Sequence, residues 1–150
     1  MKKSPQQEKF EKMLDASKFS ACGFMGRDTR TIWEIIDADT AKLEKLGITK
    51  EKIAARMQEI TVHGIRGIGD WIAVSDTIRA MVDDTRGKIP CPWAHGIRCL
   101  KRITTIERID TGQTLRWSDL SIHLILAHGF FQGKGSPFRL EPEDLVNALW

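Results

Sequence analysis

The sequence lacks the features by which membrane and secreted proteins are recognised. No apolar run approaches the roughly 18 consecutive residues of a membrane span. The basic start MKKSPQQEKFEKML has no apolar segment behind it, so it predicts no signal peptide. Cysteine is scarce, and the 3 thiols are an odd number in a chain without an export signal. We therefore expect reduced cysteines in a cytoplasmic protein with no membrane segment.

Strong charge of one sign is also missing. The net charge of +3 is mildly basic and falls short of the concentrated basic patch of a dedicated nucleic-acid binder. The chain contains neither a GxxxxGK[ST] phosphate loop nor a GxGxxG nucleotide fingerprint. No Ser-His-Asp order, paired acidic motif or cofactor fingerprint points to a reaction, so composition leaves enzymatic activity open.

The composition that is present suits one globular domain over residues 1–150, because 41% of the residues are hydrophobic and 29% are charged. Helical spacing of apolar residues dominates the first part, and β-branched runs appear only after Gly69. The fold class that this order predicts is α+β, a helical N-terminal part followed by a small antiparallel sheet with packed C-terminal helices. The expected helices cover 5–19, a segment after Asp28 or Thr29 up to Gly47, a segment capped by Thr49, a segment capped by Ser118, and one from Pro142. The expected strands cover 71–83, 88–91, 101–109, 114–116 and 138–140, with a turn at 84–87.

The most informative pattern is the spacing of Cys91, His95 and Cys99, with His123 and His128 downstream. Thiolate and imidazole are ligands that zinc prefers. The spacing therefore predicts a zinc site in which Cys91, His95 and Cys99 provide three ligands and His123 or His128 provides the fourth. Residues five apart lie well around a helix from each other, so we do not expect both histidines to reach one ion. The structural alternative is that the cysteines are small buried hydrophobic residues and no cofactor is bound.

Thiol chemistry is another alternative for the same loop. Cys91 is a candidate nucleophile and His95 a candidate partner, because Arg86, Lys88 and His95 lie close enough in sequence to lower a thiol pKa. No local signature of a known thiol enzyme surrounds Cys91, so the catalytic residues stay unassigned.

Glycines and basic side chains gather between residues 86 and 139. The segment GFFQGKGSP at 129–137 has the composition of a loop that cradles an anion, although it can equally be a surface connection. The sequence favours binding of an anionic small molecule or a protein partner through the 86–139 region. The residues predicted to converge on the small molecule are Arg116, His123, His128, Lys134 and Arg139.

The segment LEKLGITKEKIAARM at 43–57 has the pattern of a helix-turn-helix, with Lys50, Lys52 and Arg56 available to contact DNA. Leu43 stands where such motifs generally need a small residue, so plain helix packing is favoured over nucleic-acid binding. Exposed tryptophans could instead anchor a partner protein. The candidates for such anchors are Trp71, Trp93, Trp117 and Trp150.

Two segments carry a resemblance to known proteins: RGKIPCPW at 86–93 and DTGQTLRWSDLSIHLILAHGFFQGKGSPFRLEP at 110–142. With them the chain resembles a family of small uncharacterised bacterial cytoplasmic proteins. The resemblance implies a bacterial, cytoplasmic setting. It implies no activity or ligand, so the site has to be argued from the residues.

Overall fold

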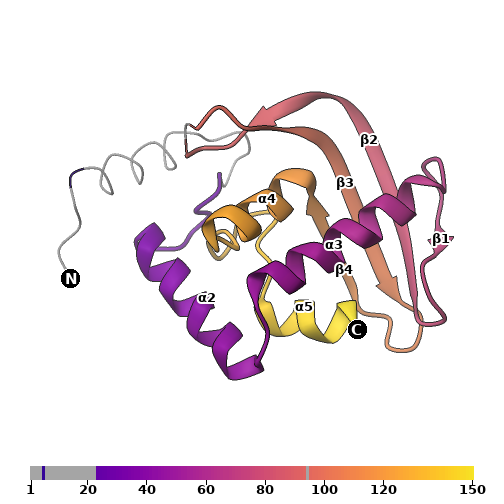
Figure 1. Cartoon of the computed structure of the whole chain (residues 1–150), viewed down its shortest axis with the longest axis horizontal. Coiled ribbons are helices and arrows are strands. Elements are labelled where there is room, and N and C mark those ends of the chain that lie inside the picture. The colour runs from indigo at the N-terminus through magenta and orange to yellow at the C-terminus, as the bar shows by residue number, and fades with distance from the viewer. Residues whose placement is uncertain (1–4, 6–22, 94) are drawn as a thin grey trace.

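The computed structural model describes Pro5, residues 23–93 and residues 95–150, which form an α+β fold with helices first, then an antiparallel sheet, then further helices (Figure 1). The predicted fold class is therefore confirmed. The predicted helix over 5–19 lies outside the described residues except for Pro5. No helix in the described part of the chain is both long and apolar enough to cross a bilayer. The elements are α2 (Ile32–Leu46), α3 (Lys50–Ile65), β1 (Ile72–Ala73), β2 (Ile78–Pro90), β3 (Arg98–Arg108), β4 (Thr114–Ser118), α4 (Asp119–His128) and α5 (Pro142–Leu149).

The sheet has the order β1-β2-β3-β4 with every neighbouring pair antiparallel. Strands β2 and β3 form a long curved ribbon, which the prediction of a turn at 84–87 missed (Figure 1). Thr85 pairs with Lys101 and Lys88 pairs with Leu100, so the two residues between Thr85 and Lys88 form a bulge. The expected end of the strand at Asp83 was wrong, because pairing with β3 on both sides of the bulge carries the strand through to Pro90.

Helix ends follow local capping signals. The Thr49 side chain accepts a hydrogen bond from the Lys52 N–H, and Ser118 caps α4, as predicted. Helix α2 starts later than expected, because Thr31 forms a reciprocal capping box with Glu34. The expected strand at 138–140 is a turn followed by irregular backbone.

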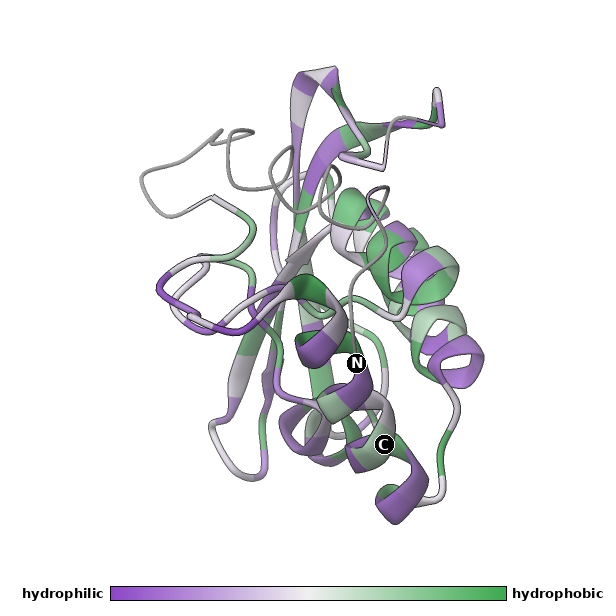
Figure 2. Ribbon diagram, turned by 90° about the vertical axis from the view of Figure 1, so that its left-hand side faces the viewer, coloured by the Kyte–Doolittle hydropathy of each residue, from purple (hydrophilic) through white to green (hydrophobic). Residues whose placement is uncertain are grey.

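The helices bury one side of the sheet. Helix α3 packs on β2, helix α4 packs on β3 and on α3, and α5 contacts α2 and α3. Each helix carries both hydrophobic and hydrophilic residues around its axis (Figure 2). The fully buried Trp117 of β4 donates its indole N–H to Thr61 of α3 at 2.9 Å, and Thr61 bonds to Thr104 of β3 at 2.9 Å. This buried polar chain fixes α3 against the sheet and satisfies the indole nitrogen.

Candidate metal centre

Four metal-ligating side chains converge at the end of the β2–β3 ribbon. Cys91, His95, His123 and His128 each offer one ligand atom, and these atoms all lie within 4.8 Å of one another. Two of the residues come from the loop that connects β2 and β3, and two come from α4. The site therefore joins a loop to a helix that lies about thirty residues further along the chain.

The loop brings its two ligands together by a tight reversal. The Cys91 N–H donates to the Ile97 carbonyl at 2.9 Å, which closes the intervening segment. Gly96 adopts φ +80, a left-handed conformation that glycine takes without strain. As a result His95 Nε2 lies 3.0 Å from the buried Cys91 Sγ.

Helix α4 supplies both remaining side chains of the cluster, of which the sequence predicted only one. The ring centroids of His123 and His128 lie 5.4 Å apart. The Trp93 ring stacks on the His128 ring at 4.0 Å between centroids and 8° between planes, and so fixes its orientation. Both histidines therefore lie in the cluster, whereas the sequence predicted that only one would reach it.

Hydrogen bonding within the cluster cannot account for its geometry. His95 Nε2 lies 3.3 Å from His123 Nε2, 3.2 Å from His128 Nε2 and 3.0 Å from Cys91 Sγ. A neutral imidazole nitrogen carries either one proton or one lone pair, so it can satisfy one of these neighbours and not all three. A single cation at the centre would accept a lone pair from every ligand at once.

Three of the distances in the cluster also match those between ligand atoms around zinc. Bonds of about 2.0–2.1 Å to nitrogen and about 2.3 Å to sulfur place tetrahedral ligand atoms about 3.3 Å apart for two nitrogens and about 3.5 Å apart for nitrogen and sulfur. His95 Nε2 lies 3.2 and 3.3 Å from the two other imidazole nitrogens, and Cys91 Sγ lies 3.5 Å from His128 Nε2 and 3.0 Å from His95 Nε2. The remaining separations in the group stay within 4.8 Å. The cluster is therefore close to the size of a zinc coordination shell.

The electrostatics of the cluster suit a cation more than a free proton. Burial, with contributions from neighbouring His123, His95 and Lys50, lowers the pKa of His128 from 6.5 to about 4. Burial and then His95 lower the pKa of His123. Both imidazoles are thus neutral near pH 7 and present lone pairs, which is the form that a metal binds.

Cys91 is poorly suited to be a nucleophile by itself. Burial raises the pKa of the Cys91 thiol, so the reactive thiolate is disfavoured without a cation beside it. A bound metal would supply that cation and hold the sulfur as thiolate.

The third residue of the predicted zinc set, Cys99, lies outside the four-residue cluster. It sits on β3 opposite Ile89, half-buried against the core that includes Phe24 and Leu120. Burial and then the nearby Cys91 raise the pKa of its thiol. Of the predicted set of Cys91, His95 and Cys99, the cluster therefore contains Cys91 and His95, together with His123 and His128, and not Cys99.

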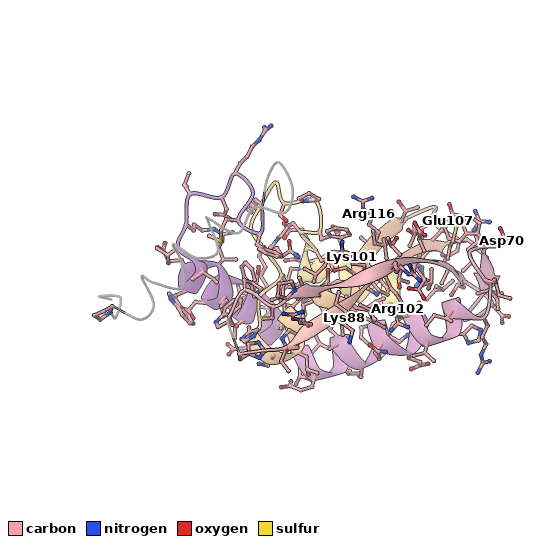
Figure 3. The ribbon with its side chains drawn as sticks, turned by 90° about the horizontal axis from the view of Figure 1, so that it is seen from above. Asp70, Lys88, Lys101, Arg102, Glu107 and Arg116 are labelled. Carbon is pink, nitrogen blue, oxygen red and sulfur yellow. The ribbon has the colours of Figure 1, made fainter. Side chains whose placement is uncertain are left out.

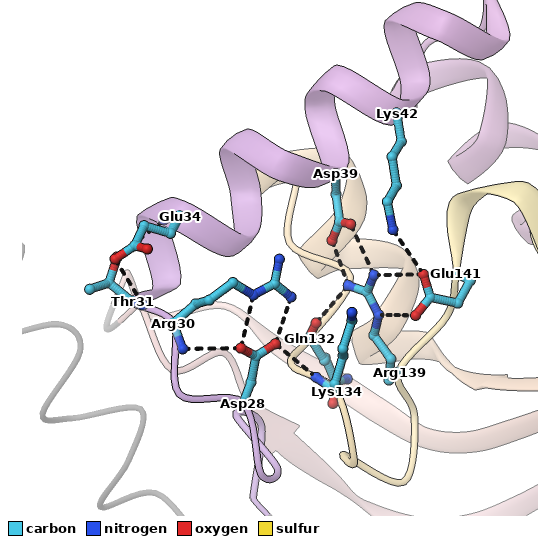
Figure 4. A network of polar contacts seen from close by, with 10 residues as sticks. All are labelled: Asp28, Arg30, Thr31, Glu34, Asp39, Lys42, Gln132, Lys134, Arg139 and Glu141. Atoms are coloured by element: carbon cyan, nitrogen blue, oxygen red, sulfur yellow. Dashed lines mark hydrogen bonds and ion pairs between the residues drawn. The ribbon is translucent and has the colours of Figure 1, made fainter.

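The residues predicted to bind an anion fall into three separate groups of contacts. His123 and His128 belong to the metal cluster. Arg116 is exposed on β4, with its guanidinium 5.0 Å from the centre of the Phe138 ring. Lys134 and Arg139 belong to a polar network with α2 and the turn before it (Figure 4). The anion site predicted from these five residues is thus not assembled as one group.

The network in Figure 4 fixes the loop that follows α4. The largely buried Arg139 guanidinium bonds to both carboxylate oxygens of the fully buried Asp39, at 2.5 and 2.9 Å, and to Glu141. The Lys134 N–H donates to Asp28 at 3.1 Å, while the Lys134 side chain is exposed. These residues hold the segment 132–141 against α2.

The predicted helix-turn-helix pair exists as α2, the left-handed Gly47 and α3. Arg56 donates to the Leu149 carbonyl at 2.9 Å, and Lys52 lies 5.7 Å from the centre of the Trp150 ring. These contacts bind α3 to the C-terminal segment and favour packing over DNA contact. The predicted partner anchors differ among themselves: Trp71 and Trp150 are exposed, Trp93 is half-buried on His128, and Trp117 is fully buried.

No protein-family model, curated protein or solved structure matches this chain.

Proposed function

We propose that the protein is a metalloprotein that binds one zinc ion through Cys91, His95, His123 and His128. The observation that supports this most strongly is the convergence of four ligand atoms within 4.8 Å from two distant segments. Neither hydrophobic packing nor hydrogen bonding requires three imidazole nitrogens to face one sulfur.

The donor set selects the metal. One thiolate and three imidazoles suit a borderline-soft ion, whereas calcium and magnesium require oxygen ligands. Tetrahedral geometry and the absence of any redox requirement favour zinc among the ions that such a set accepts. Copper or nickel at the same four ligands would keep the site and change only the ion.

Four protein ligands complete a tetrahedral shell and leave no position for a reactive water. The zinc therefore acts as a structural link. It joins the β2–β3 loop to α4, and its charge compensates the Cys91 thiolate in a buried position. Because such a site does not preform in the unfolded chain, zinc binding contributes directly to the folding free energy.

The test is elemental analysis and native mass spectrometry of protein purified without a metal-affinity tag. We expect one zinc per chain, and loss of most of it in Cys91→Ser and His95→Ala. The matched controls are Cys99→Ser and His63→Gln, which alter a thiol and an imidazole outside the cluster. Wild-type protein that takes up no metal on dialysis against zinc, or variants that retain it fully, would contradict the proposal.

A further inference from the structure

A cleft of about 340 Å³ opens at the sheet, apart from the metal cluster, and none of the four cluster residues lines it. This volume lies within the range of about 300–1,000 Å³ that is typical of small-molecule sites. The walls are mainly apolar, with Phe24, Ile103, Leu120 and Phe138 among the lining side chains. No carboxylate is among the lining residues.

One buried polar side chain of the cleft has a donor group to which no other described residue is hydrogen-bonded. Gln132 is 4% exposed, and its Oε1 accepts a hydrogen bond from the Ser136 hydroxyl at 2.5 Å. Its amide nitrogen makes no hydrogen bond within the described part of the chain. Gln132 itself is one of the residues that line the cleft. Gln132 therefore offers N–H donors to whatever occupies the cleft.

The backbone holds this donor in place at a conformational cost. Gln132 has φ +69, a left-handed value that side chains other than glycine rarely adopt. The Arg139 guanidinium donates to its carbonyl at 2.8 Å, and the next residue, Gly133, donates its N–H to the Phe24 carbonyl at 2.9 Å. Such strain persists where the surrounding structure fixes the conformation, and it concentrates at ligand sites.

Positive charge lines the same cleft. Lys101 of β3, labelled in Figure 3 beside Arg102, is exposed and lines the cleft. It makes no ion pair with the described residues, whereas Arg102 pairs with Asp119 at 2.8 Å. One unpaired ammonium group and one amide donor suit a single negative charge with two acceptor oxygens.

We propose that this cleft binds a small monocarboxylic acid with an apolar tail. The carboxylate is held by Lys101 and Gln132, and the tail packs between Ile103, Phe24 and Phe138. None of the four cluster residues lines the cleft, so zinc binding and carboxylate binding are measured separately and either proposal can fail without the other.

The experiment is calorimetric titration of the full chain with sodium octanoate, with 1-octanol as the uncharged ligand of equal chain length. We expect octanoate to bind at least about tenfold more tightly than octanol, because a charge-assisted hydrogen bond is lost with the alcohol. Lys101→Gln should weaken octanoate binding by at least about tenfold. Lys88→Gln is the matched control, since Lys88 is exposed on the paired strand and does not line the cleft.

A second readout locates the ligand. In a ¹⁵N-edited spectrum, octanoate should shift the side-chain amide signals of Gln132. His63→Gln, which alters a side chain outside both the cleft and the metal cluster, should bind octanoate as the wild type does. Absence of octanoate binding, equal affinity for octanol, or unchanged affinity in Lys101→Gln would overturn the proposal.

Discussion

His95 Nε2 lies 3.2 Å from His128 Nε2, although the two residues are 33 positions apart in the chain. The first belongs to the loop after β2 and the second is the last residue of α4. Two imidazole nitrogens at this separation, with a third imidazole and a thiol beside them, are placed as they would be around a shared ion.

Zinc should stabilise the folded protein. An ion that binds only the native state at 100 times its Kd contributes about 2.7 kcal/mol, which raises the Tm of a domain of this size by about 5–10 °C. Thermal melting of metal-free protein with and without zinc measures this shift. His123→Ala should abolish the shift, and His63→Ala should retain it. An equal shift in both variants would show that zinc acts elsewhere.

Trp93 should support zinc affinity without touching the ion. Its ring stacks on His128 at 4.0 Å, and such a contact contributes about 0.5–1.5 kcal/mol. Trp93→Leu should therefore weaken zinc binding by about two- to tenfold in competition with a chromophoric chelator. Trp71→Leu is the control, because Trp71 is exposed and packs on Arg79. Equal zinc affinities in the two variants would show that Trp93 does not support zinc binding.

Asp28 should make stability sensitive to acid. The hydrogen bonds from Arg30 hold the pKa of this carboxyl well below its ordinary value of 3.8. The stabilisation is present above the unfolded pKa, near 3.8, and is lost as the pH falls through the lower folded pKa. Urea unfolding should show stability falling with pH below about 4 in the wild type. The fall should be shallower in Asp28→Asn, and parallel curves for the two proteins would contradict this.

Replacing Arg139 should lower the free energy of unfolding substantially. Its partner Asp39 is fully buried, so Arg139→Met leaves an uncompensated carboxylate. Loss of one partner of such a pair costs about 3–5 kcal/mol in the free energy of unfolding. The double variant Asp39→Leu with Arg139→Met should recover part of that loss in urea unfolding. Lys134→Met, which alters an exposed side chain in the same network, should change stability by less than about 0.5 kcal/mol. A double variant as unstable as Arg139→Met would show that packing, not charge, governs the site.

Local signals in the sequence were sufficient for much of the fold. The caps at Thr49 and Ser118 and the left-handed terminators Gly47 and Gly129 act within one helical turn, so the residues themselves determine them. The continuation of β2 past Asp83 could not be predicted in this way. It depends on pairing with β3, whose residues lie beyond an intervening loop.

The same distinction applies to the candidate site: contacts within a short segment could be predicted from the sequence, and contacts between distant segments could not. Cys91 and His95 were predictable as a pair because they lie four positions apart in one loop. The joint use of His123 and His128 depends on how Trp93 orients one ring, and sequence spacing carries no information on that packing. Arg139 was predicted to bind an anion because its ion pair with Asp39 could not be recognised from the sequence. The two residues lie 100 positions apart in the chain.

Cobalt titration of the metal-free protein tests the central claim most directly, because tetrahedral Co²⁺ absorbs strongly in the visible region and a cobalt–thiolate bond adds a near-ultraviolet charge-transfer band. We predict saturation at one ion per chain, with both features present. The charge-transfer band should disappear in Cys91→Ala and remain in Cys99→Ala. A weak octahedral spectrum, or a thiolate band that survives Cys91→Ala, would contradict a metal centre formed by Cys91, His95, His123 and His128.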